Sequence, residues 1–129
     1  MKYLWDTNTA IYFLQEQFPS NAEQFIDSTL QDSTPSISVI TEIELLCWKN
    51  ASETELEVMH DFINRVTIFN LEDAIKYKTV EIRKVHKIKL PDAIIAATAL
   101  IYNLILITRN IKDFKDIILV TQLINPLEQ

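Results

Sequence analysis

Four acidic residues stand beside short apolar segments that lie far apart in the chain. In three of these blocks the acid follows the apolar run, and in the fourth it opens the run. The blocks are LWDTN at 4–8, SVITEIELL at 38–46, LPDAIIAATAL at 90–100 and LILITRNIKDF at 104–114, with Asp6, Glu44, Asp92 and Asp113 as the acids. Glu42 is a second acid in the second block. If the fold brings the blocks together, their carboxylates form one cluster.

A cluster of this kind has a defined chemistry. Two ionised carboxylates about 4 Å apart repel by about 4 kcal/mol at an effective dielectric constant of 20. Three or four together need a cation, or some of them stay protonated. Hard divalent ions such as Mg²⁺ and Mn²⁺ prefer oxygen ligands of this type. Such ions activate water and neutralise the charge of a phosphodiester, so the expected reaction is metal-assisted hydrolysis of a nucleic-acid backbone.

Each acid also has a purely structural interpretation. Asp6 could be an ordinary helix N-cap. Thr41 and Glu44 form the pattern T-x-x-E, which is a capping box. Asp92 could complement the helix dipole in a first turn, and Asp113 could be a solvated loop charge. The conjunction of all four acids, rather than any one of them, favours a shared site.

The apolar pattern predicts strands that alternate with helices. Strands are expected at 3–5, 36–40, 66–69, 104–108 and 117–120. Helices are expected at 7–16, 21–30, 41–50, from Ser52 through Ile63, and at 70–85 and 91–102. Short, β-branched apolar strands of this kind predict an α/β fold, with a mostly parallel twisted sheet of about five strands and helices on both faces.

The predicted sheet places the acids on one edge. Ligands of open α/β sheets bind beyond the carboxyl ends of the strands. Asp6, Glu44 and Asp113 each follow a predicted strand, and Asp92 starts the helix that precedes the strand at 104–108. We therefore expect all four carboxylates at a common edge of the sheet.

Length and composition bound the class of protein. The 129 residues fit a single domain over 1–129, and 48% hydrophobic residues are enough for a core. No apolar run reaches the roughly 18–20 residues that span a bilayer, and no signal peptide is recognisable, so we expect no membrane partner. The only cysteine, Cys47, excludes an internal disulfide and is expected to be buried in a mostly buried helix. A cytoplasmic location is expected.

Glycine is absent, so backbone positions with positive φ are expected to fall mostly on asparagine. Five asparagines lie where the apolar pattern changes, at Asn50, Asn70, Asn103, Asn110 and Asn125. Asn103 lies between a predicted helix and a predicted strand, which indicates a left-handed helix C-cap. Asn70 is expected to cap the helix that follows it.

The charge is unevenly distributed. The formal net charge is −6, which argues against broad nonspecific nucleic-acid binding. The segment 76–89, however, holds six of the twelve basic residues against one acid. The segment could contact the phosphates of RNA, with Lys84 and Lys87 as the candidate residues. The alternative is a solvated helix face with Tyr77, Val80 and Val85 turned inward.

At the four blocks the chain resembles the PIN-domain ribonucleases, especially the VapC-type toxins of bacterial and archaeal toxin–antitoxin pairs. LWDTN is similar to the opening strand and D-T-N of that family, and SVITEIELL to S-x-x-T-x-x-E-L. LPDAIIAATAL resembles the D-x-x-I-A-A-x-A helix, and LILITRNIKDF resembles the closing strand with T-x-N-x-x-D/E-F. The resemblance covers nearly the whole chain. It implies a PIN-like α/β/α sandwich, Mg²⁺ or Mn²⁺, endoribonuclease activity, a homodimer and an antitoxin partner that blocks the site.

The resemblance also implies roles for individual residues. Asp6 and Asp92 would be the main metal ligands, and Glu44 would complete the acidic cluster or orient the attacking water. Many relatives carry aspartate where this chain has Asn110, so Asp113 is favoured as the fourth catalytic acid. The supporting residues implied by the resemblance are Thr7, Asn8, Thr108 and Asn110. Arg109 lies beside the fourth acid and could steady the scissile phosphate of RNA or pair with Asp113.

Two other functions are compatible with parts of the pattern. A phospho-acceptor receiver domain shares the doubly wound fold and an acidic pocket, but it needs paired acids after the first strand, and Asp6 has no acidic neighbour. A catalytically weak or inactive PIN-like module that binds RNA or a protein partner is the alternative that Asn110 keeps open. Retention of Asp6, Glu44 and Asp92 favours the active enzyme.

Overall fold

The computed structural model describes residues 2–129, and its centre is one five-stranded sheet. The strands lie in the order β3-β2-β1-β4-β5, and every neighbouring pair is parallel. Their bounds are β1 (Tyr3–Trp5), β2 (Ser36–Ser38), β3 (Thr67–Phe69), β4 (Ile105–Ile107) and β5 (Leu123–Ile124). The prediction of an α/β fold with about five parallel strands is confirmed.

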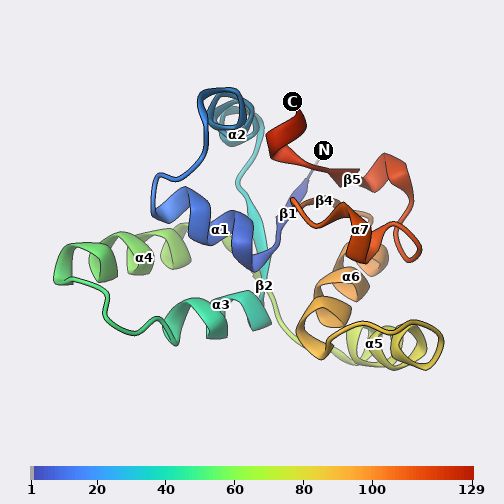
Figure 1. The fold of residues 1–129 in the computed structure, drawn as a ribbon. Helices are drawn as coiled ribbons and strands as arrows, with labels where there is room; N and C mark the ends of the chain where they lie inside the picture. The colour runs from blue at the N-terminus through green and yellow to red at the C-terminus, as the bar shows by residue number, and fades with distance from the viewer. Residues whose placement is uncertain (1) are drawn as a thin grey trace.

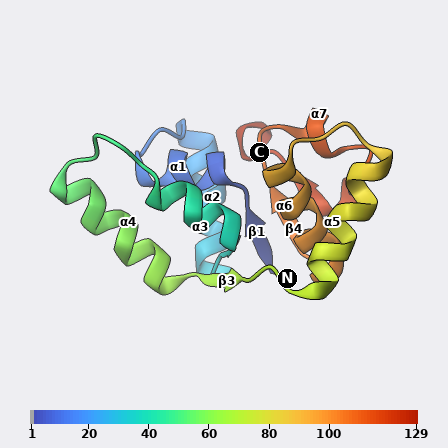
Figure 2. The same cartoon turned by 90° about the horizontal axis from the view of Figure 1, so that it is seen from below.

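Helices connect the strands and cover both faces of the sheet (Figures 1 and 2). The long and short helices are α1 (Thr7–Leu14), α2 (Ser20–Asp32), α3 (Val39–Leu46), α4 (Glu53–Arg65), α5 (Asp73–Val85), α6 (Leu90–Tyr102), α7 (Ile111–Phe114) and the 3-10 turns η1 (Val120–Gln122) and η2 (Pro126–Glu128). Figure 2 shows α1 to α4 on one side of β1 and α5, α6 and α7 on the other. This is the predicted α/β/α sandwich.

Alternation along the central strands creates two hydrophobic cores. In the pairing of β1 with β4, Leu4 lies opposite Leu106 and Trp5 lies opposite Ile107. Successive strand residues point to opposite faces. Leu4 and Leu106 accordingly pack with α5 and α6, whereas Trp5 and Ile107 pack with residues of α1 to α4. All four side chains are fully buried, which fixes the central strands and the segments that follow them.

Local capping signals explain several helix ends. Ser52 and Glu55 form a capping box at the start of α4, where the sequence predicts a helix, and both reciprocal hydrogen bonds are present. Asn103 ends α6 in the left-handed conformation, at φ 51° and ψ 50°, as predicted. Asn50 also has a positive φ, of 64°. Asparagine therefore does replace glycine at two of the five predicted positions.

Other local predictions were wrong. Asn110 and Asn125 have φ values of −96° and −92°, Asn70 is not among the positive-φ residues of 2–129, and Glu16 has an unpredicted φ of 54°. The cap of α5 is Glu72 rather than Asn70. These residues lie in loops, where the change of apolar pattern marks a boundary but does not fix the dihedral angles.

The capping box expected at Thr41 is also absent. Ser38 caps α3 and accepts a hydrogen bond from the backbone N–H of Ile40, so the helix begins before Thr41. The helix is less buried than expected, because Ile43 and Leu46 are about half exposed. Cys47, just beyond its end, is exposed rather than buried. The apolar residues of this segment correctly predicted a helix, but the helix is more exposed than we expected.

Two further segments differ from their predicted structure. The strand predicted at 117–120 is instead a loop in which Ile118 is buried against the core, and the fifth strand lies at Leu123–Ile124. On α5, the residues expected to turn inward, Tyr77, Val80 and Val85, are 66%, 47% and 76% exposed. The buried face of α5 is made by Ile75, Thr79 and Ile82.

No helix within residues 2–129 combines the length and apolar character that crossing a membrane requires.

Candidate functional site

Asp6 follows β1 directly and serves as the N-cap of α1. Its Oδ1 accepts a hydrogen bond of 2.8 Å from the backbone N–H of Thr9. The residue is only 4% exposed. Burial raises the pKa of its carboxyl, while hydrogen bonds from Thr108 and Thr9 and the charge of Arg109 act in the opposite direction. The capping interpretation is therefore correct, and the charge of the same carboxylate also acts on Asp92.

Glu44 is held by a threonine from another helix. The hydroxyl of Thr7 on α1 donates to Glu44 Oε1 at 2.7 Å, and Thr7 Oγ1 is also 3.0 Å from the buried Thr41 Oγ1. Two threonines thus tie the start of α1 to α3 and fix the position of the Glu44 carboxylate. Thr7, expected to support the site, is in contact with it.

Asp92 lies in the first turn of α6 and is half-buried. The N-cap of this helix is Lys89, so the carboxylate of Asp92 is not used as a cap. Burial is the largest cause that raises the pKa of Asp92, followed by the negative charges of Asp113, Asp6 and Glu44. Lys89 lowers this pKa. All three of the other predicted acids therefore lie within electrostatic reach of Asp92.

The fourth block forms the short helix α7, which the sequence did not predict. Asp113 is in its first turn, and Asn110 precedes it without making a side-chain cap. Thr108 is fully buried, and its hydroxyl oxygen accepts a hydrogen bond of 2.9 Å from the backbone N–H of Asn110. The side chain of Thr108 also acts as a hydrogen-bond partner of Asp6. Thr108 therefore links the end of β4 to Asp6, while Asp113 projects beyond it.

The donor set suits a hard divalent cation. The carboxylates of Asp6, Glu44, Asp92 and Asp113 supply only oxygen ligands, which Mg²⁺ and Mn²⁺ prefer. Burial is the largest cause of the raised pKa values of Asp6 and Asp92, and neither carboxylate forms an ion pair among residues 2–129. Over the same residues, no three acidic, histidine or cysteine side chains stand at the spacing of a ready-made metal cluster. The acids lie close enough to act on one another electrostatically, but among the described residues they do not form such a cluster.

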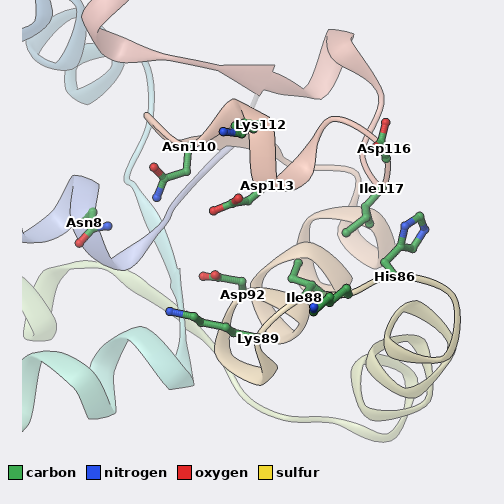
Figure 3. A pocket seen from close by; sticks show the side chains of 11 residues that line it. Asn8, His86, Ile88, Lys89, Asp92, Asn110, Lys112, Asp113, Asp116 and Ile117 are labelled. Atoms are coloured by element: carbon green, nitrogen blue, oxygen red, sulfur yellow. The ribbon is translucent and has the colours of Figure 1, made fainter.

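A cavity of about 470 Å³ opens over part of this acidic group. Its lining includes Asp92, Asp113 and Asp116, with Asn8 and Asn110 at one end. Figure 3 shows the carboxylates of Asp92 and Asp113 pointing into the same space from α6 and α7. Asn8, predicted as a supporting residue, is exposed at the rim of this space. Asp6 lies beneath the surface and Glu44 lies outside the lining.

Basic residues contribute to the same cavity. Lys87 lines it, as do His86, Lys89 and Lys112, whereas Lys84 does not. Of the two lysines expected to contact phosphate, the structure thus places only Lys87 in the cavity. The solvated helix face proposed as the alternative holds for Lys84, which is exposed on α5.

Arg109 does not pair with Asp113, which was one of the two roles considered for it. Its guanidinium donates to the hydroxyl of Tyr12 on α1 and lies 4.8 Å from the centre of the Tyr12 ring. It makes no ion pair with Asp113 among the residues 2–129. Its charge still reaches Asp6, where it favours the ionised carboxylate.

Sequence reasoning missed several residues at this edge. Lys89 precedes Asp92 by three residues, and Lys112 precedes Asp113 by one. This closeness in sequence to the predicted acids could have indicated that the two lysines belong to the site. Asp116 lies three residues beyond Asp113. No sequence pattern indicated a role for Tyr12, because its contact with Arg109 joins residues 97 positions apart.

Comparisons with known proteins match the fold and the order of these blocks. A family model described as PIN domain matches residues 3–118. The chain belongs to the PIN-domain family. No curated protein sequence matched the chain.

Solved PIN-domain structures are similar over almost the full length of the chain. A toxin–antitoxin complex from Klebsiella pneumoniae contains a chain 31% identical, with a TM-score of 0.75 and coverage of 97% of this chain and 98% of that one. VapBC2 from Rickettsia felis, bound to a DNA fragment from its promoter, is 26% identical, with a TM-score of 0.75 and 96% coverage of both chains. DNA-bound VapBC from Salmonella typhimurium is 28% identical, with a TM-score of 0.75 and coverage of 91% and 92%. The predicted resemblance to VapC-type PIN toxins is therefore confirmed.

Proposed function

We propose that this PIN-domain protein is a metal-dependent endoribonuclease, the toxin component of a toxin–antitoxin pair. The observation that carries the proposal is that the carboxylates of Asp92 and Asp113 point into one cavity, with Asp6 and Glu44 close enough to act on Asp92. Four blocks separated in sequence supply these acids to one edge of the sheet. Carboxylates that act on one another need a cation or stay partly protonated, and a divalent ion beside this cavity would support phosphodiester hydrolysis.

The residues of the site would have different roles, according to their positions. Asp6 and Asp92 would be the main ligands of Mg²⁺ or Mn²⁺, with Asp113 as the fourth acid. When bound, the ion would supply Lewis-acid activation of water and neutralise phosphate charge. Glu44, held in place by Thr7, would complete the acidic group or orient the attacking water. Thr108 would keep the Asp6 carboxylate aligned, because it bonds to Asp6 from the end of β4.

Asn110 would play a supporting role rather than bind the ion directly. An amide oxygen binds a hard cation more weakly than a carboxylate does. Both Asn110 and Asp113 line the cavity, so the carboxylate three residues later can substitute for an acid at position 110.

We further propose a cytoplasmic, single-domain protein over 1–129 that forms a homodimer and is inhibited by an antitoxin that blocks the site. The similar structures from Rickettsia felis and Salmonella typhimurium are VapBC complexes, which supports a protein partner. The mass of the purified chain in solution tests the dimer. A species of twice the 15.0 kDa chain mass supports it, and a species of the single-chain mass contradicts it.

A cleavage assay on total RNA tests the enzyme. The protein is incubated with RNA in Mg²⁺, in Mn²⁺ and in EDTA, and the new ends are mapped. We expect defined cuts that need the divalent ion and disappear in Asp92→Asn. Asp116→Asn is the matched control, because Asp116 lines the same cavity but does not act on the Asp92 carboxylate. Equal cleavage in EDTA, or retained cleavage by Asp92→Asn, would contradict the proposal.

A further inference from the structure

The cavity beside Asp92 has a basic wall formed by Lys87, Lys89 and Lys112. We propose that this wall binds the phosphates that flank the scissile bond of a single-stranded RNA segment, and that the rest of the basic segment 76–89 does not. The inference rests on the proposed ribonuclease function and names the residues that would position its substrate.

The three lysines form no ion pair among the described residues, although the charge of Lys89 acts on Asp92. Over residues 2–129, the ion pairs are Lys76 with Asp73 and Lys78 with Glu81, both within α5. Lys87, Lys89 and Lys112 take part in neither, although three aspartates share their cavity. Within the described residues these ammonium groups are therefore available to an external anion. A phosphate backbone is the anion that this combination fits.

The backbone around the three lysines determines which of their side chains line the cavity. Ile88 packs against the hydrophobic core, and its carbonyl accepts a hydrogen bond of 3.2 Å from Arg83 Nε. This anchors the loop between α5 and α6 at its centre, so Lys87 and Lys89 on either side line the cavity. Lys112 comes from α7, on the other side of the acids. Figure 3 shows Lys89 and Lys112 on opposite sides of the Asp92 and Asp113 carboxylates.

The size of the cavity favours a single strand. Its volume of about 470 Å³ lies within the range of roughly 300–1,000 Å³ that holds small-molecule ligands. One nucleotide of a flexible strand can enter such a hollow and bring its phosphate to Asp92. A duplex would have to unpair and unstack that nucleotide, at a cost on the order of a few kcal/mol. The whole chain has 18 acids against 12 basic residues, so its net charge repels RNA away from this cavity.

Salt-dependent RNA binding in EDTA tests the wall without requiring cleavage. A labelled single-stranded oligoribonucleotide is titrated with the wild type and with Lys89→Ala/Lys112→Ala over a range of NaCl concentrations. Each lost phosphate contact should reduce the slope of log K against log salt by about 0.7 for a single strand, so the double variant should lose about 1.4. The control is Lys84→Ala/Lys115→Ala, which removes the same charge from exposed lysines three residues away from Lys87 and Lys112.

The outcomes separate this inference from the proposed function. A reduced slope in the cavity variant and an unchanged slope in the control support the wall, whether or not the wild type cleaves RNA. Equal slopes in the two double variants overturn it, even if the wild type cleaves RNA. In the cleavage assay, the cavity variant should raise KM and leave kcat nearly unchanged. Equal affinity of the wild type for a duplex of the same sequence would overturn the single-strand specificity.

Discussion

Asp6 combines a structural and a functional role, and a pair of substitutions can separate the two. Asp6→Asn removes the buried charge but retains an oxygen that can accept the hydrogen bond from the backbone N–H of Thr9. Asp6→Ala removes both. Loss of the cap costs about 0.5–2 kcal/mol of unfolding free energy, typically about 1 kcal/mol. Asp6→Asn should therefore be more stable than Asp6→Ala by about 1 kcal/mol, or roughly 4 °C in Tm for a domain of this size.

Against the wild type, Asp6→Asn should be at least as stable at neutral pH. Burial raises the pKa of Asp6, so the folded protein disfavours the ionised carboxylate. Each unit of such a shift corresponds to about 1.4 kcal/mol. The penalty is absent below the ordinary pKa of 3.8 and fully present above the raised pKa. The advantage of Asp6→Asn over the wild type should therefore appear at pH 7.5 and shrink as the pH falls toward 4.

The assay is urea unfolding of the wild type and both variants in EDTA at pH 7.5 and at pH 4.5, paired with RNA cleavage in Mg²⁺. Both variants should lose cleavage, and only Asp6→Ala should lose the cap. The reasoning is refuted if Asp6→Asn is destabilised as much as Asp6→Ala with no dependence on pH. It is also refuted if Asp6→Asn keeps wild-type cleavage.

Two further substitutions test how neighbouring residues support the site and the fold. Thr7→Val keeps the shape of the side chain but removes the hydroxyl that donates to Glu44, so RNA cleavage should fall about 10- to 100-fold with a stability change of no more than about 1.5 kcal/mol. Unchanged cleavage rates would show that the position of Glu44 does not depend on Thr7. Asn103→Ala removes the short polar side chain that makes the left-handed conformation at φ 51° accessible, and it should cost about 1–2 kcal/mol in thermal unfolding, whereas Asn103→Gly should be neutral or stabilising. Equal stability of these two variants would contradict the left-handed cap.

The sheet edge and its acids were predictable because the physics involved is local and periodic. Short β-branched runs predict buried parallel strands, and parallel strands end at one edge. Asp6 and Asp113 follow two such strands, which pair with each other in the sheet as β1 and β4. The start of the first helix directly after β1 was also predictable, because aspartate is a residue type that favours the N-cap position.

The basic wall could not be predicted from the charge pattern. A run of lysines shows that a segment is polar, but it does not show which members face a cavity. The distinction between Lys84 and Lys87 depends on the loop that Ile88 and Arg83 anchor. Lys112 joins them only through the packing of α7, a helix of four residues that is too short to give a periodic signal.

Burial was the least predictable property. Apolar residues near 117–120 predicted a strand, yet Ile118 is buried from a loop, and the two-residue β5 comes later. Burial of an apolar side chain does not require a hydrogen-bonded ladder. Cys47 lies at the end of α3 beyond its buried face, so its apolar neighbours misled the prediction.

Direct titration with Mn²⁺ tests the central claim that four separated acids form one cation site. Binding is measured by calorimetry at pH 7.5 for the wild type, for four single variants and for Asp116→Asn. The four are Asp6→Asn, Glu44→Gln, Asp92→Asn and Asp113→Asn. We predict that affinity falls at least about 10-fold in Asp6→Asn and Asp92→Asn, falls in the other two, and is unchanged in Asp116→Asn. Wild-type affinity in both Asp6→Asn and Asp92→Asn would contradict the shared site.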